Sequence, residues 1–158
     1  MRKLAIAFAF AFLARCAFTS TPRSPVELPP LSFSPLHGST VSIAVFDQRA
    51  GDQDPAWQKR LESDLRDALE KAGLQVAPDA PNKFELHLLR ARSDFQNRQW
   101  KACVALSCRV IGAKNVEASG DACAVKSTLW ARGTADGALR LAYQDALGKV
   151  LSALDSHL

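Results

Sequence analysis

The chain of 158 residues lacks the features that mark a membrane-spanning protein or a common enzyme. Its longest apolar run has eleven residues, whereas a helix that crosses a bilayer needs about 20. The three histidines are far in sequence from Cys103, Cys108 and Cys123, and the chain has neither a Gly-rich phosphate loop nor an H-x-x-x-H pair. The sequence therefore predicts no transmembrane helix, no metal site, no cofactor and no enzymatic activity.

The N-terminus has the pattern of an export signal. Three residues, two of them basic, precede the apolar run, and Arg15 and Cys16 follow it. A basic start before a short apolar segment is typical of a secretory signal peptide. We expect residues 1–15 to be removed, the rest of the chain to function outside the cytoplasm, and Cys16 to be a membrane anchor.

The net charge is small once this segment is set aside. The whole chain carries a formal charge of +4. Residues 1–15 hold three of the 20 basic residues and none of the 16 acidic ones, so the remainder carries 17 against 16, a net +1. Nucleic-acid-binding domains usually carry a strong basic excess. The composition therefore indicates no nucleic-acid partner.

Residues 16–38 are expected to form a proline-rich tether. They contain five of the eight prolines, and proline neither continues a helix nor donates to a strand ladder. At about 3.1 Å per residue in the polyproline conformation, roughly 20 residues would span ~60 Å. The apolar residues between Val26 and Phe33 leave an alternative, in which the segment packs back onto the domain and its reach is shorter.

Residues 39–158 are predicted to fold as one α+β domain. An alternating β-branched run predicts a strand at 41–46, and Asp54-Pro55 before a stripe of apolar residues predicts a helix that ends at Gly73. Other periodicities predict a short extended piece at 74–76, strands at 84–95, 100–110 and 123–131, and a closing helix at 139–154. This β-α-β-β-β-α order indicates a two-layer sandwich, with two amphipathic helices on a mostly antiparallel sheet of about four strands.

Besides Cys16, the chain has three cysteines, which allows one disulfide and one leftover thiol. Successive side chains of a strand point to opposite faces. The patterns place Cys108 and Cys123 on the apolar faces of their strands and Cys103 on a polar face. We therefore predict a Cys108–Cys123 disulfide; the alternative is three reduced cysteines, two of them in the core.

Two groups of polar residues are candidate partner contacts. Asp47 and Arg49 follow the first strand, where they either meet a partner at the end of the sheet or only stabilise the turn. A basic stripe is expected across the hairpin that turns at 97–98, formed by Arg90, Arg92, Arg98 and Lys101. The stripe either binds an acidic partner or anionic lipid, or is only a solvated face of the sheet.

A strand that ends in Asp47-Gln48-Arg49 resembles the opening of the YajG-like family of bacterial outer-membrane lipoproteins. The helix followed by 74–76, Ser93-Asp94-Phe95 before the hairpin, and the closing helix are similar to that family in order and spacing. The similarity covers residues 39–155. It implies an outer-membrane lipoprotein that faces the periplasm and has no known enzymatic activity, and related small lipoproteins are accessory subunits of envelope transport and lipopolysaccharide-export machinery.

The same resemblance makes residues 13–16 a lipobox, the recognition sequence for lipid attachment. Leu13 and Cys16 match the pattern, whereas Arg15 stands where Gly, Ala or Ser is normal. Ala17 is not the aspartate that retains a lipoprotein in the inner membrane, so a lipidated chain is expected to reach the outer membrane. The departure at Arg15 leaves an unlipidated, soluble periplasmic protein as the alternative.

The first functional hypothesis is therefore a non-catalytic lipoprotein domain, tethered to the outer membrane through Cys16, that binds or supports an envelope protein complex. The runner-up is a soluble periplasmic carrier that holds a small hydrophobic ligand between sheet and helices. A third is an enzyme with an unrecognised site, which a buried polar cluster would indicate.

Overall fold

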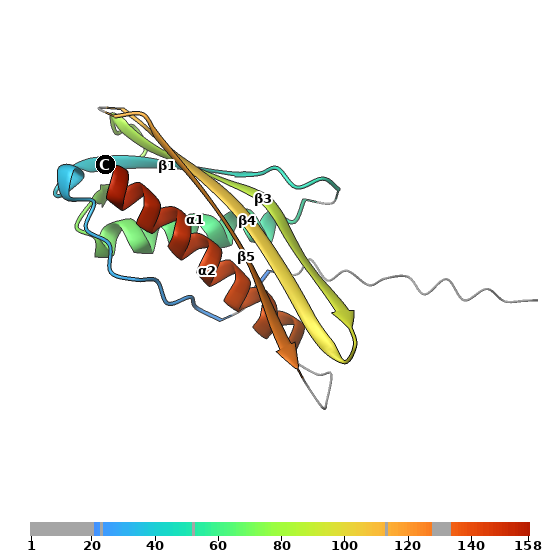
Figure 1. The fold of residues 1–158 in the computed structure, drawn as a ribbon. Coiled ribbons are helices and arrows are strands. Elements are labelled where there is room, and N and C mark those ends of the chain that lie inside the picture. Colours follow the sequence, from blue (N-terminus) through green and yellow to red (C-terminus); the bar gives the residue numbers. More distant parts are fainter. Residues whose placement is uncertain (1–20, 23, 52, 113, 128–133) are drawn as a thin grey trace, which may run out of the picture.

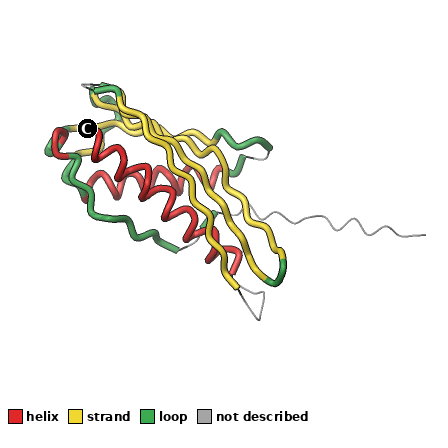
Figure 2. The backbone as a smooth tube through the Cα atoms, in the orientation of Figure 1, coloured by secondary structure: helices red, strands yellow, loops and turns green. Residues whose placement is uncertain are grey.

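The computed structural model describes residues 21–22, 24–51, 53–112, 114–127 and 134–158. The expected signal peptide, Cys16, and positions 129 and 131 of the predicted last strand lie outside these residues. Two helices lie on one face of a five-stranded sheet (Figures 1 and 2). The predicted α+β class is confirmed, with five strands where about four were expected.

The elements are a short 3-10 helix (Ser34–Leu36), β1 (Thr40–Asp47), α1 (Pro55–Lys71), β2 (Gln75–Val76), β3 (Asn82–Gln96), β4 (Gln99–Ile111), β5 (Val116–Ser127) and α2 (Thr134–His157). The sheet order is β2-β1-β3-β4-β5. β1 is parallel to β2 and β3, whereas β3, β4 and β5 are antiparallel neighbours. The sheet is therefore mixed, and its long ladders are the antiparallel ones.

Helix α1 forms as its end signals predict. The Asp54 carboxylate accepts a hydrogen bond from the Ala56 N–H at 2.9 Å, and Pro55 occupies the first helical position. Gly73 ends the helix with φ +87°, a conformation that glycine adopts without a steric penalty. The apolar stripe of the helix is buried, comprising Trp57, Leu61, Leu65, Ala68 and Leu69.

The β3–β4 hairpin is long and closes in a two-residue turn at the expected place. Asn97 and Arg98 have φ of 52° and 59°, as the primed turns of tight hairpins require. The register shifts between Leu88 and Arg90, and Leu89 is left exposed in this bulge. Ladder pairing of β3 with β1 ends at Leu88, so the rest of the hairpin extends beyond β1 as an arm (Figure 1).

The last strand faces the opposite way from the prediction, because its buried side is made of small residues. Ala118 and Ala122 are buried, and a Cβ added to Gly120 would lie 2.8 Å from the Ala146 carbonyl oxygen of α2. The helix therefore approaches this face closely. Cys123 and Val125, which were expected on the inner face, lie on the outer one, and Val125 is 53% exposed.

The segment before β1 packs across the helices. This agrees with the alternative in which the proline-rich segment packs back onto the domain. Its blue trace runs along the helix side of the molecule (Figure 1). Phe33 is fully buried, and the Asp155 carboxylate of α2 accepts the N–H groups of Ser32 at 3.1 Å and of Phe33 at 2.5 Å. The Arg60 guanidinium donates to the Ser24 carbonyl at 2.8 Å. Residues 24–38 therefore pack against the folded unit.

We predict that Asp155→Ala loosens this segment. The change removes a charged acceptor from two main-chain donors, which costs about 2 kcal/mol of unfolding free energy. Limited proteolysis should then cut the variant between residues 24 and 33 faster than the wild type. Asp145→Ala on the same helix is the control, because its pair with Lys149 is exposed and removal should cost less than about 0.5 kcal/mol. Equal cleavage of both variants would contradict the prediction.

Candidate partner-binding surface

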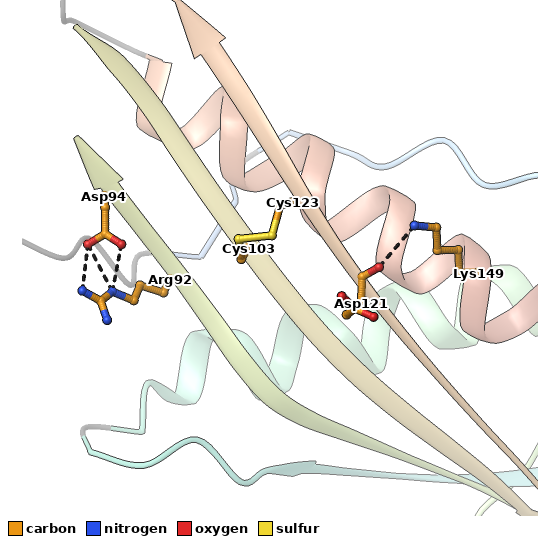
Figure 3. Close-up of a disulfide and its surroundings, with 6 residues drawn as sticks. All are labelled: Arg92, Asp94, Cys103, Asp121, Cys123 and Lys149. Carbon is orange, nitrogen blue, oxygen red and sulfur yellow. Dashed lines mark hydrogen bonds and ion pairs between the residues drawn. A yellow bond between two sulfur atoms is a disulfide. The ribbon is translucent and has the colours of Figure 1, made fainter. Parts of the chain in front are cut away.

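The face of the sheet opposite the helices carries the polar side chains of the β3–β4–β5 arm. In register, Arg92 of β3 lies beside Cys103 of β4, which lies beside Cys123 of β5. The next row towards the turn brings Asp94 beside Lys101. Figure 3 shows this surface with the three strands running side by side. Residues of three strands are thus held on one surface by ladder pairing.

The disulfide joins Cys103 to Cys123, so the predicted Cys108–Cys123 pairing is wrong. The two bonded residues are direct cross-strand partners with Cα atoms 4.1 Å apart. Cys108 lies opposite Ala118 instead, on the inner face of β4, where it is fully buried. The error arose because the prediction assigned the wrong face of β5 to the core. Successive residues of a strand point to opposite faces, so a shift of one residue exchanges the buried side chains for the exposed ones. Cys108 is a core residue, and burial raises the pKa of its thiol to about 12.

Three members of the predicted basic stripe come together in one groove. The groove, about 290 Å³ in volume, is lined by Arg90, Arg92, Asp94, Gln96, Lys101 and Cys103. Arg92 is neutralised in part, because its Nε lies 3.0 Å from the Asp94 carboxylate (Figure 3). Arg98 lies in the turn and does not line the groove. The arrangement suits an anion that meets Arg90 and Lys101 from solvent.

The other predicted pair, Asp47 and Arg49, is buried and closed on itself. Their side chains are each 6% exposed, and an Arg49 Nη2 lies 2.6 Å from the Asp47 carboxylate. The guanidinium also lies 5.6 Å from the centroid of the Trp57 ring. The hydrogen bonds from Arg49 hold the pKa of Asp47 below its usual value. These residues stabilise the turn after β1 and are not brought into the groove.

The end of the outer face that is farther from the hairpin turn carries both acidic and basic side chains. Lys83 lies 2.8 Å from Glu85, and Glu85 lies in register with Arg109, which lies in register with Glu117. The hydrogen bond from Lys83 is the main reason why the pKa of Glu85 is lowered. Acids and bases alternate here, so the excess of positive charge is confined to the hairpin end.

One partly buried polar cluster joins α1 to α2, and sequence reasoning missed it. The Tyr143 hydroxyl donates to the Asp64 carboxylate at 2.9 Å, and Arg60 Nε lies 2.5 Å from the same carboxylate. Burial raises the pKa of Tyr143 well above its usual value. Arg60 also donates to the segment before β1. The cluster thus connects both helices and that segment. Arg60 and Asp64 are four residues apart on α1, whereas no local pattern in the sequence signals the contact with Tyr143.

Within the part of the chain that the structure describes, no three potential metal ligands gather in one place. None of the helices seen there is long and apolar enough to cross a membrane.

Comparisons with known proteins show similarity in fold but not in sequence. No protein-family model matches the chain, and no curated protein matches it. A DUF330 protein from Xanthomonas campestris is 13% identical with a TM-score of 0.50, over 82% of this chain and 90% of that one. A hypothetical protein from Chlamydia trachomatis is 13% identical with a TM-score of 0.52, over 74% and 96%. A minor lipoprotein from Acinetobacter baumannii is 14% identical with a TM-score of 0.50, over 78% and 92%. These likenesses show a shared fold alone.

We predict that the Cys103–Cys123 bridge stabilises the arm. The residues are 20 apart in sequence, and closing a loop of that length contributes about 3 kcal/mol. Denaturant unfolding should show this loss in the Cys103→Ala/Cys123→Ala double variant, and a reductant should destabilise the wild type but not the variant. A non-reducing peptide map should contain the 103–123 cross-link; a 108–123 cross-link would contradict the assignment.

We predict that Asp47→Ala destabilises the protein by about 3 kcal/mol, because it leaves the Arg49 charge buried without its partner. The pKa of Asp47 is lowered on folding, so its contribution is complete above about pH 4 and is lost as the pH falls through the lowered value. The variant should therefore lose less stability than the wild type between about pH 5 and pH 2. Glu62→Ala is the control, because its pair with Arg66 is exposed and should contribute under about 0.5 kcal/mol.

Proposed function

We propose that this chain is a non-catalytic lipoprotein domain of the YajG-like kind, anchored through Cys16 to the periplasmic side of the outer membrane, that binds an envelope protein complex. The observation that carries the proposal is the uncovered outer face of the arm, where Arg90 and Lys101 line one groove. The partner that fits this charge is an acidic surface. The fold shared with a minor lipoprotein of Acinetobacter baumannii supports the lipoprotein part.

The outer face suits partner binding because its shape is fixed in advance. Ladder pairing on both sides of β4 and the Cys103–Cys123 bridge hold the strands of the arm in register. A surface ordered before binding loses less conformational entropy when the partner arrives. The exposed Arg90 and Lys101 side chains would contribute mainly to the association rate and to the choice of partner.

A soluble carrier is the second candidate, and one observation favours it. A cavity of about 340 Å³ lies between the segment before β1 and α1, and its lining includes Val26, Leu28, Leu31 and Ala68. This volume falls within the range of small-molecule pockets, about 300–1,000 Å³. The cavity lies outside the helix layer, whereas the sequence-based hypothesis placed the ligand between sheet and helices.

The anchor is tested by the mass of the mature protein from its native envelope. We expect a mature chain that starts at an acylated Cys16 and needs detergent for release, whereas Cys16→Ser should be released without it. An unmodified N-terminus in a freely soluble fraction would refute the anchor and favour the carrier.

The binding surface is tested by a photo-cross-linking residue in living cells at position 96, where the exposed, uncharged Gln96 lines the groove. We expect discrete protein adducts that decrease at least about fivefold when Arg90→Glu reverses the neighbouring charge. The same cross-linker in place of Arg66, an exposed position on α1, should give none of these adducts. Adducts that are insensitive to Arg90→Glu would show that the groove does not select the partner.

A further inference from the structure

The outer edge of β5 forms a second surface, separate from the groove on β3 and β4. β5 is the last strand of the sheet and, among the described residues, pairs only with β4. The odd-numbered residues from Glu117 to Ser127 are all exposed. A free strand edge presents main-chain donors and acceptors that another chain can pair with.

The register tells which groups point outwards. Gln96 and Gln99 flank a two-residue turn and so form a hydrogen-bonded pair, and bonded and non-bonded pairs alternate along an antiparallel ladder. Cys103 therefore directs its main-chain groups at β3, and its partner Cys123 directs them away from β4. The same holds for Ser119, Asp121 and Val125. Consistently, Lys149 Nζ donates to the Asp121 carbonyl at 3.2 Å (Figure 3).

A groove lies directly beside this edge, on its inner side. It has a volume of about 570 Å³ and runs between β5, α2 and the segment before β1. Small residues make the floor, with Ala124 from the strand and Gly148 from the helix. A strand added to β5 would place alternate side chains in this groove and the others on the outer face.

The groove beside the edge and the stretch around Asp121 carry a small acidic excess, although Lys126 of the same strand is basic. Glu27 and Asp145 line the groove with a single cation, Lys149, which is 3.1 Å from Asp145. On the outer face, Asp121 lies opposite the uncharged Ala105. A second copy that paired through its own β5 in the register setting Asp121 opposite its counterpart would place like charges together, which is unfavourable. The charge therefore favours a basic partner.

We propose that the β5 edge binds a basic extended segment of another protein by strand addition. Main-chain hydrogen bonds to the outward-facing residues supply affinity, small apolar side chains enter the groove beside Ala124 and Gly148, and basic side chains lie against Asp121. Lys149 covers the edge carbonyl of Asp121 when the site is empty and turns away when the strand docks.

The test uses the mature chain and a capped seven-residue peptide of alternating Lys and Val, titrated by calorimetry at physiological salt. We expect saturable binding, and none of comparable affinity for the Glu-Val peptide. Two N-methylated peptides decide whether a strand forms. In an added strand, alternate amide N–H groups face β5 and the others face solvent. Methylation of the set that faces β5 should abolish binding, whereas methylation of the other set should leave the affinity within about threefold. If both methylated peptides bind like the parent, the contact is electrostatic only and strand addition is refuted.

Variants of the protein locate the site. Val125→Pro removes an outward N–H that makes no ladder bond, so it should weaken binding about tenfold while leaving the fold intact by circular dichroism. Val125→Ala keeps the N–H and should bind within about threefold of the wild type.

Arg90→Glu, on the other surface, should leave peptide affinity within about threefold, which separates this site from the proposed partner groove. Equal binding by both position-125 variants would overturn the assignment. So would sedimentation showing that Val125→Pro dissociates an oligomer of the chain itself.

Discussion

The close contact between α2 and the small-residue face of β5 is the constraint on which the rest of the structure depends. Gly120 has no room for a Cβ, because the Ala146 carbonyl and a Val150 methyl group lie within 3 Å of that position. This contact decides which face of β5 is buried. It therefore places Cys123 on the outer face beside Cys103, and it brings α2 near enough for Lys149 to reach the strand edge.

The helix layer is fixed by polar contacts as well as by apolar packing. Tyr143 and Arg60 both bind the Asp64 carboxylate, and Asp155 holds the segment before β1. In the low dielectric of the interior, satisfied polar groups specify one arrangement, because any other leaves a donor or a charge without its partner. The cluster thus has a structural explanation, and it gives the enzyme hypothesis no support of its own.

Most of the secondary structure could be predicted from the sequence, but few of the contacts between distant residues could. The caps and stripe of α1, the turn at Asn97 and the buried face of α2 are local patterns, so they could be predicted. The face of β5 could not be predicted from hydrophobic alternation, because alanine and glycine are small enough to lie on either side. Four alternate small residues ending at Ala124 were the available signal for close helix packing. The ion pairs of Asp47 with Arg49 and of Asp64 with Arg60 are local, and so were open to sequence reasoning. The contacts of Asp64 with Tyr143 and of Asp155 with residues 32–33 depend instead on how distant parts of the chain pack.

The disulfide connects the two grooves in addition to stabilising the arm. Cys103 lines the basic groove, and Cys123 lines the acidic one beside α2. Because the bridge joins directly opposed residues of β4 and β5, the two grooves keep a fixed separation and orientation. If both proposed sites are occupied, the rigid arm holds two partner segments in a defined relation without a rearrangement of its strands. A fixed relation between two protein-binding surfaces is consistent with the proposed binding of an envelope protein complex, and a carrier of one small ligand does not require it.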